Sequence, residues 1–273
     1  MGGPVTVSGR PVVGAWPAAR VVALMPGSLP MGGVVPETPV HAFAEPAPAL
    51  GFAAAAPQTP TRHDIDLGGL LAFEVRGLLA PEEADALVQA SERFGFREEA
   101  PGISTPPGMR LNKAVHWMAD AELMHVLAER MLPLLPERVD GWRLVPRLSA
   151  RLNMYRYDDG DVFQRHTDGD WPGYSLSADR QAMETWSPSI RSCLTMLLYL
   201  NGPQDGVQGG HTRLYGHGGL VRDVVPAKGS ALFFRHGFGL DSVVHAGLPV
   251  RGPVPKYVAR INVMYEATES AGF

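Results

Sequence analysis

Residues 192–201 read SCLTMLLYLN, and this stretch decides the fold class. Its nearly continuous apolar run is typical of a β-strand that is covered on both faces. Upstream, residues 147–157 read RLSARLNMYRY, in which apolar and polar side chains alternate as on a strand. Glycine, aspartate, asparagine and proline separate further short strands, which we expect near residues 211–215, 219–225, 230–235, 241–245 and 256–265.

Two helices are expected before these strands. Residues 81–93 begin with a proline and two glutamates, which suit the first turn of a helix, and an apolar face follows. Residues 120–134 carry a second apolar stripe, with Pro133 in the last turn. Helices followed by a series of short strands predict an α+β protein whose core is an antiparallel barrel or a double-sheet jelly roll.

The chain divides by composition into three parts. Residues 1–60 hold 11 of the 25 prolines and only four charged residues, so we expect an extended arm that is either loose or laid over the domain. We expect residues 61–140 to form a helical support region. Residues 141–273 are expected to form the strand-rich core.

The composition argues against several classes of function. The formal net charge of -4 and the isoelectric point of about 6.1 give no reason to expect a nucleic-acid partner. A single cysteine, Cys193, excludes an internal disulfide framework and a zinc site built from several cysteines. No run of about 18 apolar residues occurs, and prolines interrupt the first 30 residues, so neither a transmembrane helix nor a secretory signal is expected. We therefore expect a cytoplasmic protein with no membrane partner.

Three residues have the chemistry of a metal site. His166 and Asp168 stand two positions apart in RHTDG, so in a strand both side chains project from the same face. His245 lies further along the chain, at the end of an apolar strand. Two histidines and one carboxylate form the facial triad of non-haem Fe(II) oxygenases. A histidine at a strand end is also common as a structural residue, so spacing alone leaves both interpretations open.

Four segments, in sequence order, resemble motifs of the Fe(II)/2-oxoglutarate-dependent dioxygenases of the prolyl-4-hydroxylase type. Residues 155–169 (YRYDDGDVFQRHTDG) resemble the family's YRY.pGd.f..H.DG, and residues 195–212 (TMLLYLNGPQDGVQGGHT) resemble its T.LlYLN…GGeT. Residues 225–235 (VPAKGSALFFR) and 245–265 (HAGLPVRGPVPKYVARINVMY) resemble the two motifs that follow. The resemblance implies a double-stranded β-helix, or jelly-roll, core with supporting N-terminal helices.

The resemblance also implies a cofactor and a cosubstrate. His166, Asp168 and His245 would hold Fe(II), 2-oxoglutarate would chelate the iron through its keto-acid end, and O2 would be the oxidant. Lys256 matches the family's residue for the far carboxylate of 2-oxoglutarate, and a buried ammonium needs such an anion. Arg260, four residues on and on the same strand face, is expected to share this carboxylate or to contact the substrate. Ascorbate is a further candidate, as a reductant that supports the activity.

Further pocket residues follow from the same resemblance. The hydroxyls of Tyr157 and Tyr199 are expected to help hold the cosubstrate, and Thr195 lies on the same strand face as Tyr199. Side chains two apart in residues 153–157 share one face of their strand. The residues that we expect to contact the substrate are Asn153, Tyr155 and Trp171.

The chain departs from the family pattern in two motifs. The family's GGeT reads GGHT here, and its His211, with His217, is a candidate second cation site. One extra residue between His245 and Lys256 makes Arg251 and Arg260 alternative partners for the far carboxylate.

A long insertion, residues 169–190, follows the histidine–aspartate strand. Loops of this length are often lids when they lack structure of their own. Its aromatic residues are candidates for substrate contact, and they are Trp171, Tyr174 and Trp186.

The resemblance implies hydroxylation of an unactivated C–H bond, with release of succinate and CO2. An amino acid, a peptide or protein, and a small molecule all remain open as substrates, because a fold does not set the substrate. Asp168 favours hydroxylation over halogenation, whereas desaturation and cyclisation stay open. Two other classes are retained: a non-catalytic, cupin-like jelly roll that binds a metal or ligand, and a zinc hydrolase that uses His211, His217 and His236.

Overall fold

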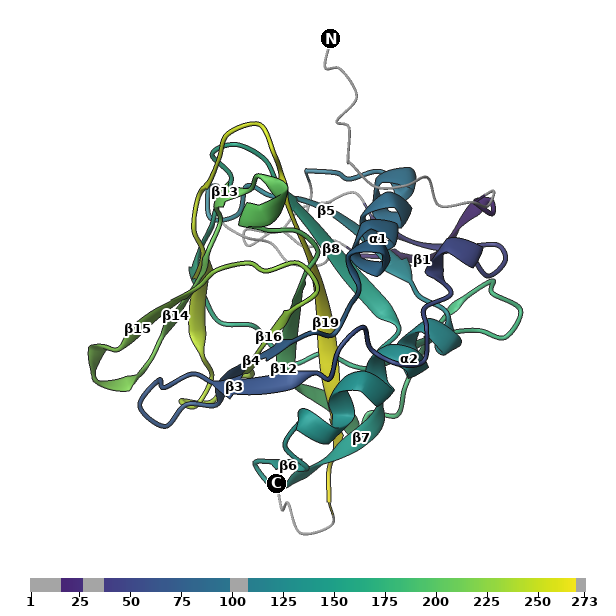
Figure 1. Cartoon of the computed structure of the whole chain (residues 1–273). Coiled ribbons are helices and arrows are strands. Elements are labelled where there is room, and N and C mark those ends of the chain that lie inside the picture. Colours follow the sequence, from purple (N-terminus) through teal and green to yellow (C-terminus); the bar gives the residue numbers. More distant parts are fainter. Residues whose placement is uncertain (1–15, 27–36, 99–107, 269–273) are drawn as a thin grey trace.

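A large, mostly antiparallel β-sheet runs through the centre of the molecule (Figure 1). The computed structural model describes residues 16–26, 37–98 and 108–268. In spatial order the strands are β1 (Ala19–Met25), β2 (Thr38–Phe43), β5 (Lys113–Met118), β8 (Arg151–Tyr157), β19 (Lys256–Glu266), β12 (Ile190–Tyr199), β16 (Ala231–Arg235), β4 (Ala72–Arg76) and β3 (Thr61–Asp64). Two more strands, β7 (Trp142–Leu148) and β6 (Arg138–Val139), extend from β19. Only β2 and β5 pair in parallel among the described strands.

A smaller sheet covers part of one face of the large sheet. Its strands, in spatial order, are β15 (Val221–Val224), β14 (Thr212–Tyr215), β17 (Val244–Gly247) and β9 (Phe163–His166). Two strand pairs stand outside both sheets, namely β10 (Tyr174–Leu176) with β11 (Met183–Thr185), and β13 (Gln208–Gly209) with β18 (Val250–Arg251). Two facing sheets with helices on the outside confirm the predicted α+β jelly roll.

The helices lie on the other side of the large sheet, opposite β14 and β15 (Figure 1). They are α1 (Pro81–Phe94) and α2 (Ala121–Met131), with short 3-10 turns at η1 (Pro48–Leu50), η2 (Leu132–Leu134), η3 (Pro203–Asp205) and η4 (His217–Gly219). The predicted second helix, residues 120–134, therefore begins one residue too early and ends three residues too late. Pro133 has no N–H and clashes with the preceding turn, so the chain tightens into η2 after Met131.

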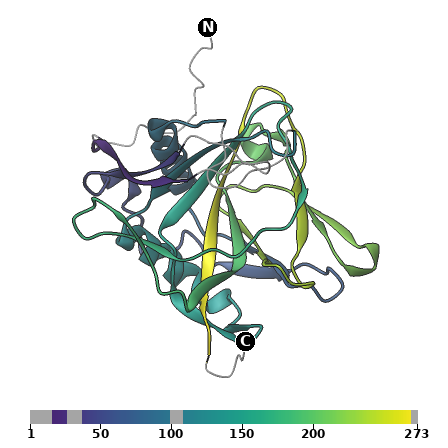
Figure 2. The ribbon, with the colours of Figure 1, turned by 180° about the vertical axis from the view of Figure 1, so that it is seen from behind.

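Strand β19 is the centre of the large sheet, and it is seen from behind in yellow in Figure 2. Ten of its eleven residues are buried, because helices cover one face and the small sheet covers the other. The predicted strand at residues 192–201 is its neighbour β12, which is buried along most of its length. The apolar run in the sequence therefore reports burial on two faces, as expected.

The described part of the predicted arm contributes to the sheet edge. Val40 and Ala42 of β2 have no exposed surface. The ring of Phe43 packs against Phe94 of α1, with ring centroids 4.5 Å apart, and against Trp117 of β5 at 6.4 Å. The arm is therefore laid over the domain at these residues, and the boundary at residue 60 stays a prediction. Residues 61–140 hold both helices, and also β3, β4, β5 and β6 of the large sheet.

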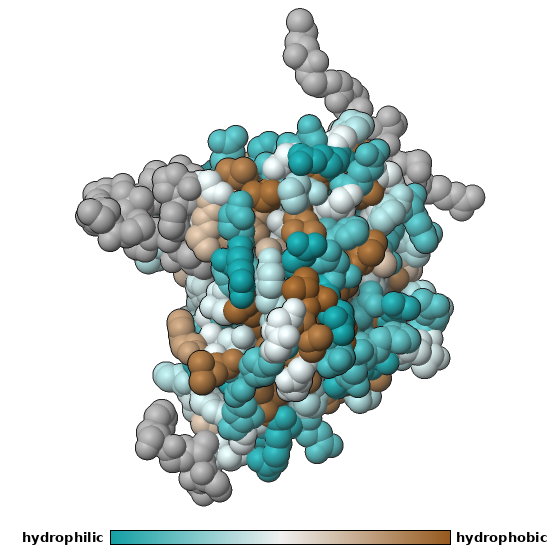
Figure 3. Space-filling view, turned by 90° about the vertical axis from the view of Figure 1, so that its left-hand side faces the viewer, coloured by the Kyte–Doolittle hydropathy of each residue, from teal (hydrophilic) through white to brown (hydrophobic). Residues whose placement is uncertain are grey.

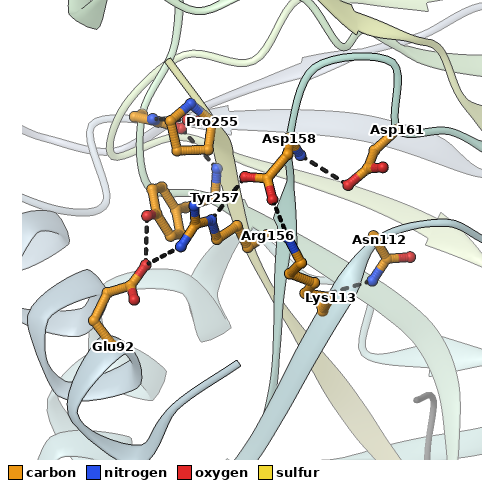
Figure 4. Close-up of polar contacts among 9 residues, drawn as sticks. Glu92, Asn112, Lys113, Arg156, Asp158, Asp161, Pro255 and Tyr257 are labelled. Atoms are coloured by element: carbon orange, nitrogen blue, oxygen red, sulfur yellow. Dashed lines mark hydrogen bonds and ion pairs between the residues drawn. The ribbon is translucent and has the colours of Figure 1, made fainter. Parts of the chain in front are cut away.

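A polar network fastens α1 to the outer face of the large sheet (Figure 4). Glu92 of α1 accepts hydrogen bonds from the Tyr257 hydroxyl at 2.5 Å and from Arg156 at 3.3 Å. Arg156 also donates to Asp158 at 2.8 Å, and Lys113 of β5 contacts the same carboxylate at 2.5 Å. The polar residues of the YRYDDGD motif that face outward therefore have a structural role.

The face of the molecule shown in Figure 3 carries both hydrophobic and hydrophilic side chains. On the face shown in Figure 3, hydrophobic residues lie in small groups among hydrophilic ones. No helix in the described part of the chain combines the length and apolar character needed to cross a membrane.

We predict that Phe43→Ala lowers the free energy of unfolding by about 3–5 kcal/mol, because it leaves a cavity between β2 and α1. Val21→Ala is the matched control, since this β1 side chain is half exposed. Chemical denaturation measures both. A loss for Phe43→Ala no larger than that of the control would show that the arm is not part of the core.

Candidate functional site

His166, Asp168 and His245 come together between the two sheets. His166 ends β9 and lies directly opposite His245 in β17, so the pairing of these strands sets the two imidazoles side by side. The Asp168 carboxylate lies 3.7 Å from Nε2 of His166 and 3.8 Å from Nε2 of His245. Potential ligand atoms of all three residues lie within 4.8 Å of one another. Among the described residues, no other group of three such side chains does so.

The backbone sets which nitrogen of each imidazole faces this centre. Nδ1 of His166 donates to the carbonyl oxygen of Gln164 at 2.7 Å, and Nδ1 of His245 donates to that of Val243 at 3.2 Å. Both Nε2 atoms are therefore left with a free lone pair toward Asp168. Nε2 of His166 is buried and has no hydrogen-bond partner among the described residues, as expected of a metal ligand.

The ionisation states also suit a cation. Burial lowers the pKa of His166 to about 3, and the neighbouring His245 adds to this shift. Burial likewise lowers the pKa of His245. Burial opposes ionisation of Asp168, but the positive charge of Arg260 brings the pKa of this carboxyl well below its usual range. Two neutral imidazoles and a carboxylate are therefore present at neutral pH, and this donor set fits Fe(II).

A hydrogen-bonded chain orients the carboxylate from behind. Thr195 of β12 donates its hydroxyl proton to Oδ2 of Asp168 at 2.7 Å and accepts from Nδ1 of His236 at 2.7 Å. Nε2 of His236 contacts the Ser192 hydroxyl at 2.8 Å. His236 was not predicted for this role, because nothing in its local sequence distinguishes it.

A cavity of about 440 Å³ opens beside the three candidate ligands. The large sheet lines it with residues of β8, β12 and β19, and the small sheet lines it with residues of β9, β14 and β17. Its size lies within the range of small-molecule sites in proteins.

Lys256 projects into this cavity from β19. It is 3% exposed, and its ammonium donates to the carbonyl oxygen of Gly210. The rings of Tyr157 and Tyr199 lie 5.4 and 5.5 Å from Nζ, and the ammonium forms no ion pair with a described residue. Burial without an anion lowers the pKa of Lys256 to about 7. Gly210 leaves room for the lysine, because a Cβ there would lie 2.9 Å from Cδ of Lys256.

Of the other residues predicted to hold a cosubstrate, some line the cavity and some lie behind its wall. Tyr157 lines the cavity beside Lys256. Tyr199 is fully buried and donates to the hydroxyl of Thr212, which lines the cavity. Thr195 contacts Asp168 instead. Arg260 lines the cavity, and its Nε lies 3.2 Å from Asp168.

The residues predicted to contact a substrate divide in the same way. Tyr155 and Trp171 line the cavity. Asn153 lies behind it, where its side-chain oxygen accepts a hydrogen bond from His116 at 2.7 Å.

The insertion at 169–190 has structure of its own. It forms the hairpin β10–β11, whose Arg180 pairs with Asp120 at 2.5 Å and donates to the carbonyl oxygen of Phe43. The hairpin is therefore tied to the arm and α2 rather than closed over the cavity. Tyr174 lies outside the main cavity but lines a small hollow beside it. The Trp186 ring lies under the Arg147 guanidinium and does not line the main cavity.

Three further histidines and an arginine do not join the site. His217 contacts the carbonyl oxygen of Gly68, and His236 lies behind Asp168, so these two do not form a zinc centre with His211. Arg251 is exposed in β18, opposite Gln208. Of the residues considered for the far carboxylate, Lys256 and Arg260 face the cavity.

Two arginines at the cavity were not predicted. Arg110 precedes β5 and reaches the cavity because its segment pairs with Phe163 of β9. Arg151 begins β8 and lines a small hollow directly behind the cavity. Neither stands in a recognisable motif, and the only signal was the excess of arginine over lysine in the composition.

A jelly roll with a buried centre of two histidines and one carboxylate defines a class of metal-dependent oxygenases. Residues 152–264 match the 2OG-Fe(II) oxygenase superfamily, and they include all three candidate ligands and Lys256. The segment therefore resembles the superfamily that its motifs predicted. A comparison with curated proteins found no match.

Solved structures with a similar arrangement include three prolyl hydroxylases. The viral collagen prolyl hydroxylase of Paramecium Bursaria Chlorella virus-1 is 20% identical, with a TM-score of 0.49 over 74% of this chain and 99% of that one. A prolyl-4-hydroxylase of Pseudomonas putida is 16% identical, with a TM-score of 0.43 over 74% and 96%. A prolyl hydroxylase of Trichoplax adhaerens, solved with a peptide fragment of hypoxia inducible factor, is 19% identical, with a TM-score of 0.44 over 67% and 74%.

We predict that Thr195→Val weakens metal binding by about 10- to 100-fold, because Asp168 loses the hydroxyl that orients it. Thr195→Ser keeps the hydroxyl and is the control. Titration with Fe(II) under anaerobic conditions measures the affinity. Equal affinities for the two variants would remove Thr195 from the metal site.

Proposed function

We propose that this protein is an Fe(II)- and 2-oxoglutarate-dependent dioxygenase that hydroxylates a C–H bond of its substrate and releases succinate and CO2. One observation carries the proposal: a donor set suited to Fe(II) and a buried lysine without an anion line the same cavity. The match of residues 152–264 to the 2OG-Fe(II) oxygenase superfamily supports it.

His166, Asp168 and His245 would hold the metal at the wall of the cavity. When bound, iron and 2-oxoglutarate supply the activation of O2 and the oxidising chemistry. The protein contributes binding, orientation and the exclusion of water. Phe163, stacked on His166 at 3.5 Å between ring centroids, shields the site from solvent on one side.

Lys256 would bind the far carboxylate of 2-oxoglutarate. An ammonium that is buried without an anion is costly, and a carboxylate in the cavity removes that cost. The Tyr157 ring and the Thr212 hydroxyl lie in the same part of the wall and would orient the cosubstrate. The candidate metal ligands and the buried Lys256 line one cavity, and this combination favours an enzyme over a cupin-like protein that only binds a ligand.

We predict that the apo-protein, titrated without O2, develops a visible metal-to-ligand charge-transfer band only when Fe(II) and 2-oxoglutarate are both present. His245→Ala should lose the band, because one of the three ligands is gone. His217→Ala is the control, since His217 contacts Gly68 outside the site. Absence of the band from metal-loaded wild-type protein would contradict the proposed function.

We predict that the affinity for 2-oxoglutarate falls as the pH rises above about 7. Below that pH Lys256 is already an ammonium, whereas above it binding must first take up a proton, so the loss approaches about tenfold per pH unit. Lys256→Arg should bind with little pH dependence, because a guanidinium stays charged. The charge-transfer band, titrated at about pH 6 to about pH 9, measures this. A wild-type affinity that stays constant across the range would exclude Lys256 as the partner of the carboxylate.

A further inference from the structure

A second, small hollow of about 20 Å³ adjoins the cavity on the side away from Lys256. We call it the arginine pocket, because Arg110, Arg151 and Arg260 all line it. Arg110, Arg260, Tyr155 and Trp171 line the main cavity as well, so the two spaces share a wall. Three guanidinium groups from three separate segments therefore meet beside the metal site.

These guanidinium groups have donors without acceptors. Nη2 of Arg110, Nε of Arg151 and Nη2 of Arg260 are buried and have no hydrogen-bond partner among the described residues. Arg151 is 5% exposed and Arg260 is 6% exposed. A buried charged donor left without a partner costs several kcal/mol, so such groups are normally paired in a finished site.

Neighbouring side chains hold the arginines in place without neutralising them. The guanidinium of Arg110 lies over the ring of Tyr155 at 4.4 Å and over that of Phe163 at 4.7 Å. Its Nε donates to Asn112 at 2.9 Å. Neither Arg110 nor Arg151 forms an ion pair with any described residue. The arginines are therefore positioned for an anion that the chain itself does not supply.

The charges of the site lead to the same conclusion. Two carboxylates line the cavity: Asp168 at the metal site and Asp170, which pairs with Arg191 at 2.7 Å. In the proposed complex Lys256 faces the far carboxylate of 2-oxoglutarate, and Arg260 faces Asp168 at 3.2 Å. The charges of Arg110 and Arg151 therefore have no counterion among the described residues.

We propose that the arginine pocket binds a carboxylate of the substrate. This inference rests on the proposed function and names its substrate class, a carboxylic acid. A guanidinium presents parallel N–H groups that match a carboxylate, which makes arginine the preferred residue for this recognition. A carboxylate oxygen fits the small volume of the pocket, while the rest of the substrate lies in the main cavity.

The arginine pocket lies close to the candidate metal ligands, so a substrate carboxylate bound there would lie close to the reacting centre. Arg260 lines the pocket and also lies 3.2 Å from Asp168, so the anion site is one side chain away from the metal ligands. The carbon to be oxidised therefore lies near the carboxylate in the substrate. The cavity of about 440 Å³ must also hold 2-oxoglutarate, which favours a small acid. The C-terminal carboxylate of a peptide has the same chemistry, and the experiment separates the two sources.

The first test uses formate and its neutral analogue formamide. The probes are added to full-length protein loaded with Mn(II) and 2-oxoglutarate, so that no turnover occurs, and the melting temperature is measured. Formate should raise the melting temperature, whereas formamide and an equal concentration of sodium chloride should not. An equal response to formate and either control would overturn the proposal.

Arg151→Gln and Arg110→Gln should each weaken formate binding by about tenfold or more, because a charged hydrogen bond is lost. Arg147→Gln is the matched control, since Arg147 is exposed and lies over Trp186. Both pocket variants should keep the wild-type affinity for 2-oxoglutarate. A change in that affinity, with formate binding unaltered, would assign the arginines to the cosubstrate instead. Arg110→Gln keeps the test decisive if Arg151→Gln does not fold.

Competition against formate identifies the source of the carboxylate. Displacement by glycine, but not by triglycine, would indicate a small acid, and displacement by triglycine would indicate a peptide C-terminus. Displacement by triglycinamide, or by none of the three, would show that the pocket takes a simple anion only and would overturn the substrate assignment. Failure of the proposed function is a separate result, because it appears as loss of the 2-oxoglutarate charge-transfer band.

Discussion

The register of β19 is the constraint on which the site depends. Lys256 lies opposite Tyr157 of β8, and Arg260 lies between Asn153 of β8 and Leu197 of β12. A shift of one residue would turn every side chain of β19 to the other face. Lys256 and Arg260 would then enter the apolar layer under the helices, where Ala259 and Ile261 pack. The cost of burying two charges among apolar groups selects the observed register.

The two sheets contribute different chemistry to the cavity. The small sheet carries His166 and His245 on paired strands, whereas the large sheet carries Lys256 and Arg260 on a single strand. The distance between the metal centre and the lysine is therefore set by the spacing of the sheets. Asp168 joins the two parts, since it follows β9 and is held by Thr195 of β12. Packing of apolar side chains elsewhere between the sheets thus positions groups that do not touch each other.

Local sequence patterns predicted the parts of the structure that local physics determines. Strand periodicity located β8, β12 and β19. The spacing of His166 and Asp168 was compatible with a metal site, and the family resemblance named the three candidate ligands. The arginine pocket and His236 were not predictable, because their residues come from distant segments and meet only after the sheets form. The edge strands β1 and β2 were also missed as strands. Their proline-rich surroundings mask the alternation, and β5, the strand through which β2 joins the sheet, is remote in sequence.

Arg260 connects two binding events through one charge. Its Nε lies 3.2 Å from the carboxylate of Asp168, and its Nη2 is left without a partner beside the main cavity. A cation bound to Asp168 takes up part of the negative charge that Arg260 faces, so the guanidinium becomes a stronger partner for a second anion. The free energies of the two events are then coupled, and thermodynamic linkage makes the coupling reciprocal. In the proposed complex, loading of the metal would thus favour the arrival of an acid, and an acid in the pocket would strengthen retention of the metal.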